Sequence, residues 1–244
     1  MIKFFRNIRQ NMINKNRATN YLLYAIGEIV LVVIGILIAL QINNANEQRK
    51  ERLKAKVYIE KIIRDLEADT TNLNGLIELG ERTMKSTERY FNYYENSDDP
   101  IETLTDSANQ VYTGINRYLP IDYTFRDMQS SGNTTLLTDE QKSELIELSN
   151  LQTYYQIVIE KGISSIFSEA QEMQKYLDYG GWAKTDFFEK LGVPQDKKTK
   201  AQGLFHKHNE LWMYHNMGRG YVNLSKRIKT KTIEVLKVLK QTSN

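Results

Sequence analysis

The stretch YLLYAIGEIVLVVIGILIALQI, residues 21–42, decides how this chain is organised. It holds 22 residues, and Glu28 is its only acidic or basic side chain. About 20 apolar residues are needed to span the hydrocarbon core of a bilayer. Only 14 residues lie between Ile29 and Ile42, so the run reaches membrane length only when Glu28 lies within it. The sequence therefore predicts a transmembrane helix over residues 21–42.

A cleaved secretory signal is the alternative interpretation of an apolar run near an N-terminus. Tyr21 and Tyr24 stand where the aromatic belt of a membrane helix belongs. The exit from the run, QINNANE over residues 41–47, contains no convincing small-x-small cleavage site. We therefore interpret the run as a retained signal anchor.

The orientation of this helix follows from the lengths of its two flanks. Lys and Arg do not decide it, because residues 1–20 carry five and the fifteen residues after the span also carry five. Long domains cross the membrane largely regardless of charge, whereas a short basic tail is retained. We expect residues 1–20 to form a basic amphipathic tail on the cytoplasmic side of the inner membrane, and residues 43–244 to form a domain outside the cytoplasm.

The rest of the chain has the periodicity of amphipathic helices, and glycine and proline are sparse. The expected elements are a long helix ending near NSDDP (96–100), a short helix over 101–112, an irregular part over 113–137, a second long helix from Thr138 to about 177, a short helix over 185–191 and a last long helix from about 201. Thr138 and Gln141 have the spacing of a capping box. The predicted fold is all-α: one N-terminal transmembrane helix followed by an extracytoplasmic bundle of three long antiparallel helices plus short helices.

The net charge of +3 hides three blocks of opposite sign. Residues 1–59 carry a net +7, residues 60–194 a net −12 and residues 195–244 a net +8. The simpler interpretation is intramolecular, with a basic C-terminal helix packed beside acidic ones. The alternative is a basic surface for nucleic acid or anionic lipid. No nucleic-acid-reading motif accompanies the charge, so we expect no nucleic-acid partner.

Three segments carry a family resemblance: MIKFFRNIRQ (1–10), YLLYAIGEIVLVVIGILIALQINNANE (21–47) and SSGN (130–133). They resemble an uncharacterised group of single-pass membrane proteins common in flavobacteria and other Bacteroidota. The resemblance implies a domain of unknown function behind one membrane helix, and a periplasm as the outer compartment. It implies no activity. This chain has Ala45 where that group usually has Trp, so the expected aromatic anchor at the outer interface is missing.

Glu28 is the main candidate for a functional residue in the membrane segment. An acid within a membrane helix is costly, and a role for it is the default hypothesis. Glu28 shares one helical face with Gly35 and Ala39, and this small-xxx-small pair permits close approach of a second helix. Three roles stay open for Glu28: polar contact in a homo-oligomer or with a partner helix, proton coupling in an ion-driven complex, or tolerated snorkelling toward the inner interface.

The three histidines, at positions 206, 208 and 215, cluster in the last long helix. His206 and Glu210 have the i, i+4 spacing of ligands on one helical face, so they are weak candidates for a metal site. The chain has no cysteine and no HExxH motif. We therefore expect no metal and no cofactor, and interpret these histidines as solvated or at the edge of the core.

The residues favour a structural or protein-interaction role in the cell envelope. There is no phosphate-binding glycine loop, GxSxG motif or nucleophile–base pair, so we expect no enzyme. The expected partners are the lipid bilayer and either a second copy of the chain or another envelope protein. Two alternatives stay open: a periplasmic sensor with a ligand pocket among the tyrosines of 112–124 and 154–176, and a subunit of an ion-driven membrane complex that uses Glu28.

Overall fold

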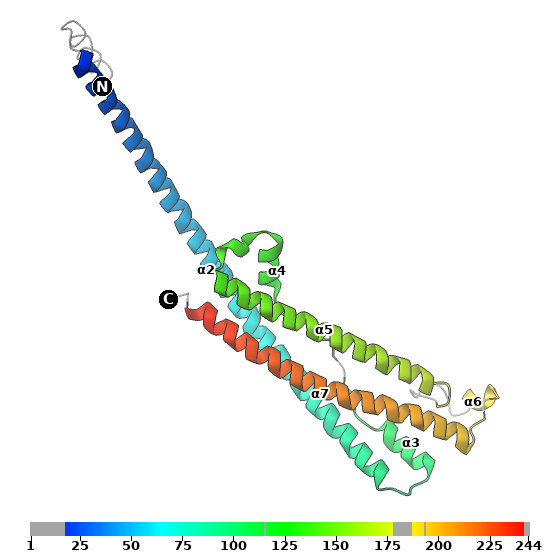
Figure 1. Cartoon of the computed structure of the whole chain (residues 1–244). Coiled ribbons are helices and arrows are strands. Elements are labelled where there is room, and N and C mark those ends of the chain that lie inside the picture. The colour runs from blue at the N-terminus through cyan, green and yellow to red at the C-terminus, as the bar shows by residue number, and fades with distance from the viewer. Residues whose placement is uncertain (1–17, 115, 178–186, 193, 242–244) are drawn as a thin grey trace. The chain divides into compact units, whose positions relative to one another are not determined.

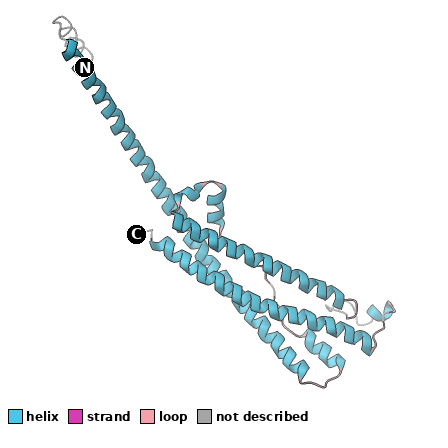
Figure 2. Ribbon diagram, in the orientation of Figure 1, coloured by secondary structure: helices cyan, strands magenta, loops and turns pink. Residues whose placement is uncertain are grey.

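The computed structural model describes residues 18–114, 116–177, 187–192 and 194–241. Within those residues the secondary structure consists of helices, turns and loops (Figure 2). The predicted all-helical class is thus confirmed for the described part of the chain. The predicted basic amphipathic tail, residues 1–20, lies outside the described residues except for its last three.

The helices follow one another in the order labelled in Figure 1. They are α2 (Ala18–Glu95), α3 (Ile101–Asn109), α4 (Tyr123–Ser130), the 3-10 turn η1 (Asn133–Leu136), α5 (Asp139–Met173), α6 (Phe187–Lys190) and α7 (Lys197–Gln241). Thr138 begins α5 with the predicted capping box, because its side chain accepts from the Gln141 N–H and Gln141 bonds back to it. The sequence did not predict α4 or η1, which lie in the part expected to be irregular.

The chain divides into two compact units, Met1–Lys56 and Val57–Asn244. In the first unit, every large apolar side chain from Leu22 to Ile42 is exposed. This stretch is the one helix of the described residues that is long and apolar enough to cross a membrane. In the second unit, α5, α7 and residues 57–95 of α2 share one apolar core.

The buried positions of the second unit repeat every seven residues, as they do in coiled coils. On α2 the buried positions include 59, 62, 66, 69, 73, 76, 80, 83, 87 and 90; on α7 they include 204, 207, 211, 218, 221, 225, 228, 232, 235 and 239. The apolar stripes predicted from the sequence account for fewer than half of these positions, namely Ile59, Ile62, Leu66 and Leu73 on α2 and Tyr221, Ile228, Val235 and Leu239 on α7. The seam also contains polar and small residues that an apolar stripe omits, among them Asp69, Thr83 and Ser225.

The three long helices do not all alternate in direction. Ion pairs join Glu67 to Lys240 and Glu81 to Lys226, so α7 runs antiparallel to α2. Lys231, on α7, pairs with Glu144 near the start of α5, so α7 also runs antiparallel to α5. The α2 and α5 helices are therefore parallel, and the prediction of three antiparallel helices is wrong for this pair.

The segment between α2 and α5 explains this difference. Residues 96–138 are too many for a tight turn, and the described residues 111–114 and 116–122 are not helical. An extended chain covers about 3.3 Å per residue, so about twelve residues can return roughly 40 Å along the unit. We call residues 111–122 the return segment. Because it brings the chain back toward the start of the unit, α5 begins beside the same end of the core as Val57.

The charges of the second unit are arranged as the intramolecular interpretation predicts. The α7 lysines meet acids of the other helices: Lys200 pairs with Glu102, Lys226 with Glu81, Lys231 with Glu144 and Glu147, and Lys240 with Glu67. Most of these pairs are exposed, and exposed pairs contribute about 0–1 kcal/mol each. Their main consequence is that much of the basic charge of α7 faces carboxylates of its own chain.

Two glycines set the closest approach of α2 and α7. A Cβ placed on Gly80 would lie 2.7 Å from the Gly218 carbonyl oxygen, and one on Gly218 would lie 3.0 Å from the Gly80 carbonyl oxygen. The two backbones therefore touch without side chains between them. From the sequence, Gly218 is expected only to weaken its helix. In the structure it lies at the contact between α7 and α2.

Gly80→Ala is expected to destabilise the second unit by about 1–3 kcal/mol, because the new methyl must push the backbones of α2 and α7 apart. Gly75→Ala is the matched control on the same helix, where a Cβ would meet nothing within 4 Å. The control should gain about 0.5–1 kcal/mol from lower entropy of the unfolded chain. Urea unfolding in detergent, followed by circular dichroism, measures both. Equal effects of the two substitutions would contradict the close contact.

Candidate functional site

The membrane-segment candidates lie together on the exposed surface of α2. Glu28, Gly35 and Ala39 are all exposed, and their spacing places them on one face of the helix. A Cβ on Gly35 would meet nothing within 4 Å in the described chain. This face is thus shaped for close approach of another helix, which remains a prediction.

The return segment is held by side chains rather than by a sheet or helix of its own. Its backbone bonds to a series of polar residues along α2: Tyr112 N donates to Ser86 (2.8 Å), Gly114 N to Thr83 (3.2 Å), Ile121 N to Asp69 (3.1 Å), and Asn72 donates to the Leu119 carbonyl (3.1 Å). Just beyond it, Thr124 N donates to Asp65 (2.8 Å). From α5, Gln156 donates to the Tyr118 carbonyl (3.3 Å). Buried backbone groups need such partners, so these side chains fix the path of the segment.

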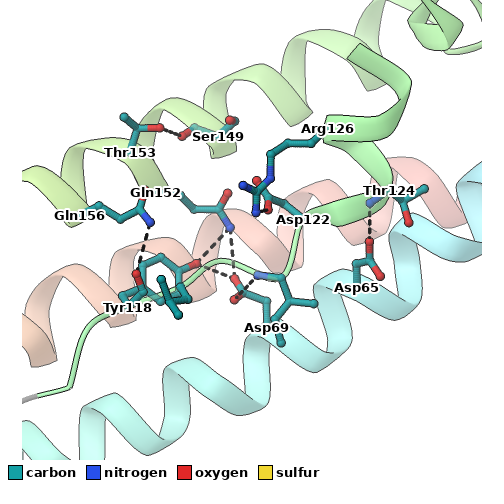
Figure 3. A network of polar contacts seen from close by, with 12 residues as sticks. Asp65, Asp69, Tyr118, Asp122, Thr124, Arg126, Ser149, Gln152, Thr153 and Gln156 are labelled. Carbon is teal, nitrogen blue, oxygen red and sulfur yellow. Dashed lines mark hydrogen bonds and ion pairs between the residues drawn. The ribbon is translucent and has the colours of Figure 1, made fainter. Parts of the chain in front are cut away.

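Asp69, Tyr118 and Gln152 form the buried centre of this arrangement (Figure 3). The Tyr118 hydroxyl donates to Asp69 Oδ2 (2.6 Å), and Gln152 Nε2 donates to the same oxygen (3.1 Å) and to the Tyr118 hydroxyl (3.0 Å). All three side chains are at most 2 % exposed. The triad thus joins α2, the return segment and α5 inside the core.

Burial governs the titration of this triad. It raises the pKa of Asp69 above its usual value, against the opposing hydrogen bonds from Tyr118, Ile121 and Gln152. Burial beside Asp69 also raises the pKa of Tyr118, which therefore stays a hydroxyl donor. The Asp69 carboxylate, the Tyr118 hydroxyl and the Gln152 amide nitrogen are hydrogen-bonded inside the protein, so the arrangement is suited to holding helices together rather than to reacting with a substrate.

The predicted tyrosine pocket is filled by protein. Tyr118 packs edge-on against Tyr155 with 5.0 Å between ring centroids, and Tyr155 packs in the same way against Tyr221. All three rings are buried. The cavity beside Asp65 and Gln152 has a volume of only about 10 Å³, too small for an organic ligand. A ligand site among these tyrosines is therefore not supported.

The SSGN stretch, residues 130–133, forms a tight turn. Gly132 adopts φ 74°, in the left-handed region that favours glycine. Ser131 Oγ donates to the Asp127 carbonyl (2.7 Å), and Asn133 Nδ2 donates to the Tyr58 hydroxyl on α2 (3.0 Å). Tyr58 donates in turn to the Asp127 carboxylate (3.3 Å). The turn is thus anchored on the first residues of the second unit.

The weak metal candidates do not face each other. His206 Nδ1 lies 2.7 Å from Glu169 Oε1 on α5, whereas Glu210 accepts from Lys207 Nζ (2.9 Å) in an ion pair that is almost fully buried. His215 Nδ1 lies 3.0 Å from the Thr87 hydroxyl. Within the described residues, no three metal-binding side chains form a cluster. His206 and Glu210 are therefore separate contacts between or within helices.

Sequence comparison supplies a family for this chain. Residues 28–190 match DUF6090, a family of unknown function. The chain belongs to this family. No curated protein and no solved structure matches the chain. The match includes Glu28, the return segment and the Asp69 triad, whereas α7 lies beyond its last residue.

Sequence reasoning did not single out the Asp69 triad. One signal was present: Asp69 and Gln152 occupy positions where the apolar stripes of their helices are interrupted. A polar residue within such a stripe needs a buried partner. The partner here is Tyr118, 49 residues from Asp69 in the sequence, and periodicity gives no information about that pairing.

Tyr118→Phe is expected to destabilise the second unit by about 1–3 kcal/mol, because Asp69 loses a buried donor. Tyr154→Phe is the matched control, since Tyr154 is exposed on α5 and such changes usually stay within about 0.5 kcal/mol. Urea unfolding of both variants measures the difference. A Tyr118→Phe protein as stable as the control would show that the triad contributes little.

Asp69 also gives the stability a dependence on pH. The pKa of Asp69 is higher in the folded state than in the unfolded state, where it is near 3.8. Protonation of Asp69 therefore stabilises the fold fully below the pKa of the unfolded state, and this contribution is lost as pH rises through the pKa of the folded state. Asp69→Asn removes that titration. The free energy of unfolding of the wild type minus that of Asp69→Asn should therefore be largest at acidic pH and should decrease toward neutral pH. Urea unfolding across this range measures it, with Asp106→Asn as an exposed control, and a difference that grows with pH would contradict it.

Proposed function

We propose that this protein is a membrane-anchored structural or protein-interaction subunit of the cell envelope, without catalytic activity. The observation that carries the proposal is the unbroken exposure of the large apolar side chains from Leu22 to Ile42. Burial of apolar surface gains about 25 cal/mol per Å². A bilayer supplies that burial for a helix of this length, while the helix satisfies its own backbone groups.

The proposed topology places residues 1–20 in the cytoplasm and residues 43–244 in the periplasm. The short basic N-terminal flank and the long C-terminal unit support this orientation. The resemblance of residues 1–10, 21–47 and 130–133 to envelope proteins of Bacteroidota supports a cell with a periplasm. The second unit accordingly acts outside the inner membrane.

Protein interaction is the role that the arrangement of residues favours. Glu28, Gly35 and Ala39 present a polar and small-residue face, which suits a second helix in the membrane. The second unit is joined internally by the Asp69 triad and has a filled tyrosine core, as expected of a rigid scaffold. The partner is either a second copy of this chain or another single-pass envelope protein.

Membrane anchoring is tested by fractionating cells that make the full chain. We expect the protein in the membrane pellet after alkaline carbonate washing, because an apolar helix of membrane length resists extraction. A reporter fused after residue 244 should be active only when it is a periplasmic reporter. Release by carbonate would contradict the anchor, and activity of a cytoplasmic reporter would contradict the orientation.

Helix contact in the membrane is tested by disulfide crosslinking, for which the natural absence of cysteine is convenient. Ala39→Cys should give a crosslinked product in native membranes, because residue 39 lies on the Glu28 face. Leu37→Cys is the matched control, since two residues turn the helix by about 200°. Adding Glu28→Ala should weaken the Ala39→Cys product. Equal products from both cysteines, or monomer alone, would contradict the proposed contact.

A proton-coupled role of Glu28 is separated from a packing role by Glu28→Gln. The amide keeps hydrogen-bonding capacity but carries no titratable proton. Under the proposed packing role, Glu28→Gln should crosslink through Ala39→Cys to nearly the wild-type extent and should support the cellular function of the gene. Loss of that function with intact crosslinking would replace the packing role with the ion-driven one.

A further inference from the structure

A cavity of about 430 Å³ lies where the end of α2, the start of α3 and the start of α7 meet. Apolar side chains form part of its wall, among them Ile101, Leu104 and Leu204. Two aromatic rings also line it, those of Tyr94 and Phe205, and Phe205 is 62 % exposed. A volume of this size is within the range of sites for small organic ligands.

The acidic side of this cavity is formed by Asp98 and Asp99. Asp99 is held in place, because its Oδ2 accepts from the Tyr93 hydroxyl (2.5 Å) and from Ser97 Oγ (2.7 Å). The hydrogen bond from Tyr93, followed by that from Ser97, lowers the pKa of Asp99, so it is charged at neutral pH. Asp98 has no hydrogen-bond or ion-pair partner among the described residues.

Helix ends of both signs border the cavity, because α2 ends there and α3 and α7 begin there, so the preference for a cation comes from Asp98 and Asp99. The α2 helix ends at Glu95 and has no basic residue in its last turn. The carbonyl end of a helix carries a partial negative charge, which attracts cations. Lys197 also lines the cavity, but it lies near Glu102 and, after the larger effect of Lys200, helps to lower the pKa of that carboxyl.

His208 forms part of the cavity wall without adding positive charge to it. It lines the cavity and packs against Tyr94 with 4.9 Å between ring centroids. Its Nδ1 atom is buried and has no hydrogen-bond partner in the described protein. Burial lowers the pKa of His208, so the ring is neutral at neutral pH. An uncharged ring does not repel a cation in the cavity.

We propose that this cavity binds a small organic amine, with its ammonium group beside Asp98 and Asp99 and its apolar body against Ile101, Leu104 and Leu204. The rings of Tyr94 and Phe205 add cation–π contact to the same site. An anion would meet the two carboxylates. A neutral analogue would lose the charge-assisted hydrogen bond. The site lies wholly within the second unit and does not depend on the membrane anchor.

The test uses the full-length protein in lipid nanodiscs and three probes of one size: benzylamine, benzyl alcohol and benzoate. Titration calorimetry, corrected with empty discs, should show saturable binding of benzylamine alone. Asp98→Asn should weaken it about tenfold, the usual effect of losing one charge-assisted hydrogen bond. Asp106→Asn, an exposed acid of α3 outside the cavity, is the matched control and should bind as wild type does.

Location is tested separately by Ala201→Leu, which adds side-chain volume inside the cavity wall and should abolish benzylamine binding. With only three histidines in the chain, imidazole NMR signals report the site directly. Benzylamine should shift the His208 signal and leave that of His215 in place. The proposal is overturned if benzyl alcohol or benzoate binds as well as benzylamine, if benzylamine does not saturate, or if both Asp98→Asn and Ala201→Leu bind it normally.

Discussion

The return segment imposes the constraint on which the second unit depends. Its described residues are not helical, and their backbone N–H and C=O groups have no sheet or helix to join. The unit meets this requirement with side chains from α2 and α5, among which Asp69, Thr83 and Gln156 are examples. Unpaired buried backbone groups would each cost about 1–3 kcal/mol. The polar residues in the α2 seam are therefore required by the path of another part of the chain.

This constraint also explains why the core is solid where a ligand pocket was expected. The segment brings Tyr118 into the space between α2 and α5, where its ring meets Tyr155 and its hydroxyl meets Asp69. Space that three helices alone would leave between them is thus filled by the chain itself. The cavity beside Asp98 and Asp99 lies at the other end of the unit, where α2 ends and the return segment has not yet begun.

Local features of the fold could be predicted because they depend on neighbours in the sequence. The capping box at Thr138, the turn at Gly132 and the long helices all follow from short-range patterns. The pairing of basic α7 with acidic α2 and α5 could also be predicted, since segments of opposite net charge attract each other whichever individual side chains pair. The parallel direction of α2 and α5 could not be predicted, because it depends on whether residues 96–138 bring the chain back toward the start of the unit. The triad was missed for the same reason, as its members meet only after that path is set.

The pairing of α2 with α7 has a consequence for the order of folding. Glu67 and Lys240 are 173 residues apart, and the contact of Gly80 with Gly218 is also distant in sequence. During synthesis the apolar seam of α2 therefore stays uncovered until α7 has been made. Contacts between distant segments slow folding and prolong the exposure of apolar surface. A chain shortened within α7 would keep its first helices and lose the wall that closes their core, so its natural fate would be aggregation or proteolysis.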